Sequence, residues 1–148
     1  MTRTEMFSRY EVEMEHYAKI INIEALTMLE MARKQLLPAI NSYMGDLART
    51  IAAKRSVSES ISTRAESRIL EQLSRDADKM ADAIEHLAAA ERTAQTMGDM
   101  TGRANAFHDK VLPLMDALRS AADDAETVCG DKYWPLPSYS QMLYYVED

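Results

Sequence analysis

Glycine, proline and cysteine are scarce in this chain of 148 residues, and each shortage excludes a class of protein. Four glycines and four prolines leave few turn signals, so a small number of long elements is expected. The single cysteine, Cys129, provides neither a disulfide framework nor a metal-binding set, which suits a reducing cytoplasm. No apolar run approaches the roughly 18 residues of a membrane helix, and no signal peptide precedes the first charged residues. We therefore expect a cytoplasmic protein that has no membrane partner.

The composition that remains is that of a globular helical protein. Apolar residues make up 47% of the chain and charged residues 28%, and the length suits one domain over residues 1–148. Many alanines, eleven methionines and no alternating β-branched runs favour an all-α fold. The net charge of −7 argues against a nucleic-acid partner.

Apolar spacing predicts an antiparallel bundle of three long helices, at about residues 3–54, 58–97 and 99–129, with a tail at 131–148. Pro38 and Pro113 lie inside the first and third helices. Each removes a backbone donor, so a kink is expected at both, and four or five helices could be counted. Thr4 is a candidate cap for the first helix. The second has two candidate starts at capping-box spacing, Ser56 with Glu59 and Thr63 with Glu66, between which the sequence does not choose.

The first helix is unusually apolar in its middle. Steps of three and four predict one buried seam, and a second apolar set predicts neighbours on another flank. The seam consists of Phe7, Tyr10, Met14, Tyr17, Ile21, Glu24, Met28 and Met31, and the second set of Ile20, Ile23, Leu26 and Leu29. Glu24 interrupts the seam. It is interpreted as a buried acid of the kind that active sites use, as a carboxylate paired with an arginine, or as a residue at the edge of the seam.

Candidate catalytic chemistry is sparse. Glu13 and His16 have the i, i+3 spacing of a di-iron bundle, but neither His86 nor His108 completes a second pair. His16 also has a weak likeness to a phosphorelay histidine, but Ile20 stands where that motif has a small residue, so an ordinary solvated helix face is the better interpretation. Cys129 lacks the setting that activates a thiol, and no phosphate loop or nucleophile motif is found. We predict no catalytic, cofactor-binding or metal-binding residue in the chain.

The tail differs in kind because two prolines, Pro135 and Pro137, favour an extended path. It carries the only tryptophan and four of the seven tyrosines, and a short last helix is expected at Tyr139–Val146. The side chains expected to bury themselves include Tyr133, Trp134, Leu136, Tyr139 and Leu143. We expect them to dock on the bundle itself, where the long first helix leaves its seam uncovered. The alternative is docking on another domain or subunit.

Two stretches carry a resemblance to a known family. They are Ser8-Arg9-Tyr10-Glu11-Val12 with Tyr17 to Ala32 and Leu37-Pro38-Ala39, and Met115 to Glu126 with the Tyr133-Trp134-Pro135-x-Pro137-x-Tyr139 segment. Here the chain resembles the C-terminal helical region of type III glutamine synthetases. The resemblance spans nearly the whole chain and is weakest between about residues 45 and 105.

The resemblance implies a cytosolic ligase that makes glutamine from glutamate, ammonia and ATP with Mg²⁺ or Mn²⁺, assembled as two stacked hexameric rings. The metal, nucleotide and glutamate residues of that family lie in upstream catalytic domains, so none is carried onto this chain. It implies a non-catalytic domain whose partners are those upstream domains and the neighbouring subunits of a dodecamer. The alternative is a stand-alone helical adaptor or phosphotransfer-like signalling module.

Overall fold

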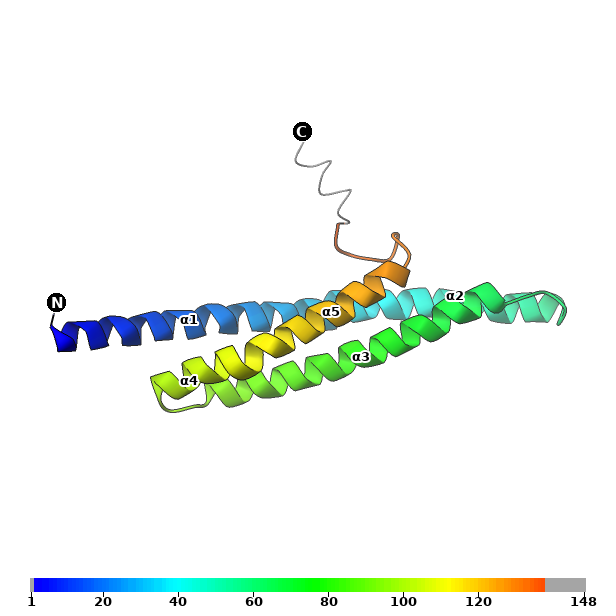
Figure 1. Ribbon diagram of the computed structural model, residues 1–148. Helices are drawn as coiled ribbons and strands as arrows, with labels where there is room; N and C mark the ends of the chain where they lie inside the picture. Colours follow the sequence, from blue (N-terminus) through cyan, green and yellow to red (C-terminus); the bar gives the residue numbers. More distant parts are fainter. Residues whose placement is uncertain (1, 138–148) are drawn as a thin grey trace, which may run out of the picture.

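The computed structural model describes residues 2–137, and every regular element in that range is a helix (Figure 1). Three long rods lie side by side, which confirms the predicted all-α bundle of three long helices. The first rod contains α1 Arg3–Met31, the π-helical turn η1 Ala32–Leu36 and α2 Leu37–Val57; the second is α3 Arg64–Gln95; the third contains α4 Met100–Ala106, η2 Phe107–Val111 and α5 Leu112–Val128.

Helix α1 begins two residues earlier than a cap at Thr4 would place it. Thr2 is the cap, because its hydroxyl accepts a hydrogen bond from Glu5 N at 3.2 Å while Thr2 N donates to the Glu5 carboxylate at 3.2 Å. This reciprocal pair is a capping box. It gives acceptors to the backbone N–H groups of Thr2 and Glu5, which have no partner within the helix.

Both internal prolines follow a π-helical turn. Leu37 N donates to Ala32 O and Leu112 N donates to Phe107 O, and Pro38 and Pro113 come immediately after these bonds. The wider π-helical turn accommodates the proline, which has no N–H and would clash with the preceding turn of a regular α-helix. The helical path therefore continues through each proline.

Helix α3 begins at Arg64, directly after Thr63, which was the second of the two candidate starts, and later than the start near residue 58. The intervening serines bond locally instead: Ser60 N donates to the Ser58 hydroxyl at 3.2 Å, and Arg64 N to the Ser62 hydroxyl at 3.3 Å. Such side-chain bonds compete with helix formation. Thr63 precedes the helix without a side-chain cap bond, and the carboxylate of Glu66 is paired with Lys54 at the end of α2.

The buried face of the first rod differs from the predicted seam. From residue 18 to residue 40 its members are spaced by three or four residues, on average close to the 3.6 residues of a helical turn. They are Ala18, Ile21, Ala25, Leu29, Ala32, Leu36 and Ile40. The predicted heptad spacing drifts around a straight helix by about 20° per heptad. Consequently Ala25 occupies the place given to Glu24, which is exposed.

The N-terminal end of α1 extends past α4 and the turn between α3 and α4 (Figure 1). Phe7 and Tyr10, which were predicted to be buried, are 65% and 52% exposed in the described part of the chain. Of the second apolar set only Leu29 is buried. Ile20, Ile23 and Leu26 point to solvent, so the predicted second flank of neighbours is not formed by residues 2–137.

Two apolar clusters follow one another along the bundle. The first is centred on Phe107, where α1, α3 and η2 meet, and the second contains Ile40, Leu73 and Met80 together with Ala125 of α5. Many alanines in both clusters let the helices approach closely.

Candidate functional site

The tail after α5 is anchored on α2 by Tyr133. Its ring lies 4.8 Å from that of Tyr43, with the planes inclined by 36°, and its hydroxyl donates a hydrogen bond to the carboxylate of Asp46. This bond, aided by Arg49, lowers the pKa of Asp46, and the same bond raises the pKa of the Tyr133 phenol.

Trp134 and Leu136 extend this contact. Both are half-buried and pack on the second apolar cluster, while Pro135 and Pro137 are exposed. The backbone turns at Gly130, whose carbonyl accepts from Tyr133 N at 2.9 Å and Trp134 N at 3.3 Å. Residues 133–136 thus lie on the bundle itself, whereas Tyr139 and Leu143, also predicted to dock, lie outside the described residues.

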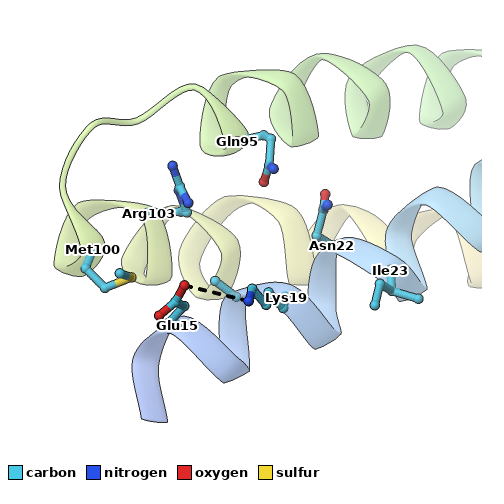
Figure 2. Close-up of a pocket in the computed structure, with 8 residues that line it drawn as sticks. Glu15, Lys19, Asn22, Ile23, Gln95, Met100 and Arg103 are labelled. Atoms are coloured by element: carbon cyan, nitrogen blue, oxygen red, sulfur yellow. Dashed lines mark ion pairs between the residues drawn. The ribbon is translucent and has the colours of Figure 1, made fainter. Parts of the chain in front are cut away.

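A pocket of about 170 Å³ lies where α1 passes the turn between α3 and α4 (Figure 2). Its lining consists of Glu15, Ala18, Lys19, Asn22, Ile23, Gln95, Met100 and Arg103. Arg103 Nη2 donates to Met97 O at 3.0 Å and so ties α4 to the turn.

Two polar atoms of this pocket are buried and have no hydrogen-bond partner among residues 2–137: Arg103 Nε and Asn22 Oδ1. Lys19 and Glu15, one turn apart on α1, form an ion pair at 3.7 Å beside the pocket; Lys19 is largely exposed and Glu15 is half-buried. A buried donor and acceptor beside a space of this size are suited to ordered water. The side chains that line the pocket include no pair of nucleophile and base.

The other residues considered for catalysis are dispersed. His16 is exposed on α1, and Glu24 is exposed and forms no ion pair within residues 2–137, so it is not a buried acid. Burial raises the pKa of the Cys129 thiol, which makes it less reactive. Within the described range no three His, Cys, Asp or Glu side chains are placed to hold a metal ion, and none of its helices could span a membrane.

The sequence analysis missed Asp76. This residue of α3 is only 1% exposed; one carboxylate oxygen accepts from Gln72 Nε2 at 3.1 Å and the other has no partner within the described part of the chain. Asp76 lies three residues after Leu73 and four before Met80, which is the spacing of one helix face, so its neighbours signal its burial even though a carboxylate does not.

Large exposed apolar side chains are concentrated on α1. Seven of the ten in the described range belong to this helix: Met6, Phe7, Tyr10, Val12, Ile20, Ile23 and Leu26. Ile20, Ile23 and Leu26, here called the outer α1 face, lie on the side away from the bundle. Single exposed apolar residues are ordinary, but a concentration on one helix indicates a contact surface.

Comparison with known proteins agrees with the sequence resemblance. Residues 1–55 match the family model described as the glutamine synthetase C-terminal domain. A glutamine synthetase of Butyrivibrio fibrisolvens is 36% identical over 143 residues, which cover 97% of this chain and 20% of that protein. A glutamine synthetase of Bacteroides fragilis is 23% identical over 145 residues, covering 95% and 20% respectively.

Over nearly its whole length, the chain is therefore similar to one part of the glutamine synthetases. It also matches the type-3 glutamine synthetase of Dictyostelium discoideum, at 24% identity over 151 residues that cover 97% of the chain and 20% of that protein. The resemblance to the C-terminal helical domain of type III enzymes is thus confirmed. The chain spans about a fifth of the length of these curated relatives.

Proposed function

We propose that this chain is the non-catalytic helical domain of a cytoplasmic type III glutamine synthetase, and that α1 is the surface on which the rest of the enzyme packs. The observation that carries the proposal is the outer α1 face together with the exposed residues before it. An apolar strip on a helix that already buries its opposite side needs a second partner to remove it from water.

The catalytic domains and neighbouring subunits of a ring-shaped oligomer are the partners that fit this strip. The relatives are about five times as long as this chain, so most of such an enzyme lies outside it. The side chains of residues 2–137 do not fit a Mg²⁺ or Mn²⁺ site. ATP, metal and glutamate would accordingly be bound by the other domains, and this chain contributes packing and assembly.

The test is a chimera in which this chain replaces the matching fifth of the Butyrivibrio fibrisolvens enzyme. We expect the chimera to assemble and to form glutamine. Substituting Ile23→Glu and Leu26→Glu together should reduce the assembled fraction severalfold, because two charges would be placed in the contact. Val57→Glu and Ile61→Glu, also at exposed apolar positions, are the matched control and should leave assembly unchanged.

Folding is separated from assembly by measuring the helical content of the isolated domain with the same substitutions, which should be unaffected at exposed sites. The isolated chain should neither form glutamine nor bind ATP with Mg²⁺ in calorimetric titration. Saturable micromolar binding of the nucleotide, or equal loss of assembly in the α1 and control chimeras, would contradict the proposal. A chimera that folds but never assembles would favour a free-standing adaptor.

A further inference from the structure

The pocket between α1, the end of α3 and α4 has far more space than a single ordered water requires. Its volume is about 170 Å³, whereas one water needs about 10–15 Å³. Asn22 comes from α1, Gln95 is the last residue of α3 and Arg103 belongs to α4. Figure 2 shows the side chains of Asn22 and Gln95 pointing toward each other from α1 and α3. A small molecule bound here therefore contacts all three rods.

Two polar atoms define what such a ligand must offer. Arg103 Nε is a donor and Asn22 Oδ1 is an acceptor, and both are buried without a hydrogen-bond partner among residues 2–137. Leaving a buried donor or acceptor unpaired costs the desolvation of that group, so a ligand that pairs both atoms is favoured. It must bring an acceptor for the guanidinium and an N–H or O–H donor for the amide.

The charges around the pocket favour a negatively charged acceptor. Lys19 and Glu15 form an ion pair with each other. Arg103 forms no ion pair with any described residue, and its bond from Nη2 to Met97 O at 3.0 Å goes to a neutral carbonyl. A hydrogen bond between a guanidinium and a carboxylate is about twice as strong as one between neutral groups. A carboxylate therefore suits Arg103 better than a neutral acceptor does.

We propose that this pocket binds a small organic carboxylate that also carries a hydroxyl or amino group. The carboxylate accepts a hydrogen bond from Arg103 Nε, and the hydroxyl or amino group donates one to Asn22 Oδ1. The inference goes beyond the packing role of α1, because the atoms that carry it need no assembled enzyme. Ile23 lines the pocket and belongs to the outer α1 face, so the ligand lies next to the surface proposed for assembly.

The probes are hydroxy acids of two, three and four carbons, because the length that fits the two contacts is part of the question. Glycolate, 3-hydroxypropionate and 4-hydroxybutyrate are each compared with the acid of the same length that lacks the hydroxyl. The full chain is titrated and the Nε–H signal of Arg103 is followed by NMR. We expect saturable shifts, with the best-fitting hydroxy acid bound about threefold or more tightly than its partner acid. Its neutral amide should bind about tenfold more weakly than the acid.

Two substitutions separate the two contacts. Asn22→Ala should abolish the preference for the hydroxy acid and leave the affinity for the plain acid unchanged. Arg103→Lys keeps the positive charge but lacks the Nε donor, and it should weaken both acids about fivefold or more, measured through the side-chain amide signal of Asn22. Arg92→Lys, at an exposed arginine in the last turn of α3, is the matched control and should alter neither affinity. The remaining NMR signals show whether each variant stays folded.

Each other outcome would overturn the proposal. No saturable shift with any acid would leave water as the occupant of the pocket. Equal affinities for hydroxy and plain acids at all three lengths would remove the contact with Asn22, and equal effects of Arg103→Lys and Arg92→Lys would place the binding elsewhere. Binding to the chain but not to the assembled chimera would identify the natural occupant as an acidic side chain of the covering domain. A chimera that does not assemble contradicts the proposed function alone, because the titration of the chain needs no assembly.

Discussion

Phe107 is the side chain on which the first apolar cluster depends most, and its removal provides the sharpest test of the fold. It is 0% exposed and begins η2, where the third rod passes both α1 and α3. Withdrawing a phenylalanine side chain from such a site loses about 1.5–3 kcal/mol of transfer free energy. The cavity left behind adds to this, so Phe107→Ala should lower the free energy of unfolding by about 3–5 kcal/mol.

Phe7 is the matched control, because it is the only other phenylalanine and is 65% exposed on the overhanging end of α1. Phe7→Ala should change the free energy of unfolding by less than about 0.5 kcal/mol. Urea unfolding followed by far-UV circular dichroism measures both values by linear extrapolation. A loss below about 1 kcal/mol for Phe107→Ala, or similar losses for the two variants, would refute the arrangement of the three rods around Phe107.

Two further predictions concern charge. Tyr133→Phe removes the hydrogen bond to Asp46, so it should lower the melting temperature. The lowered pKa of Asp46 contributes stability that is fully present above its ordinary pKa of 3.8 and is lost as the pH falls through the lowered pKa. The raised pKa of Tyr133 contributes stability that is fully present below its ordinary pKa of 10.0 and is lost as the pH rises through the raised pKa. The melting temperatures of the two proteins should thus differ most between these values and converge outside them, and a pH-independent difference would disprove this origin. Glu24→Gln in the isolated chain should change stability by less than about 0.5 kcal/mol at pH 7 and at acid pH alike, because Glu24 is exposed; a clear loss at pH 7 alone would restore the paired-carboxylate interpretation.

Apolar periodicity was sufficient to predict the three rods. Each rod buries one face, and the apolar residues of that face recur at regular spacing along the sequence. It was less reliable in choosing the buried residues of α1. The predicted heptad spacing and the observed buried face coincide at Ile21 and separate at the next step, which exchanged Glu24 for Ala25. An uncovered part of the first helix was expected from its greater length, but the position of that part depends on where α4 begins and could not be read from the sequence of α1.

The contacts of the tail show a second limit of the sequence. The composition of residues 133–136 indicated that they must be buried, but their partners follow from three-dimensional proximity. Tyr133 and Asp46 are 87 positions apart, and nothing in the local pattern of either predicts the hydrogen bond. Asp76 shows the reverse case, because its burial was readable from the spacing of its neighbours and was missed through a shift of one residue.

Helix α1 distributes its side chains in a way that an isolated bundle does not require. Between residues 18 and 26 the inner side presents Ala18, Ile21 and Ala25, while the outer α1 face presents three large residues, two isoleucines and one leucine. Small inner residues allow close approach to the neighbouring helices, which gains packing contacts. Large outer residues gain nothing in water, where charged side chains would serve solubility better. An arrangement with more apolar bulk outside than inside is stabilising only when both sides are covered, and this supports a role for α1 between the bundle and a larger assembly.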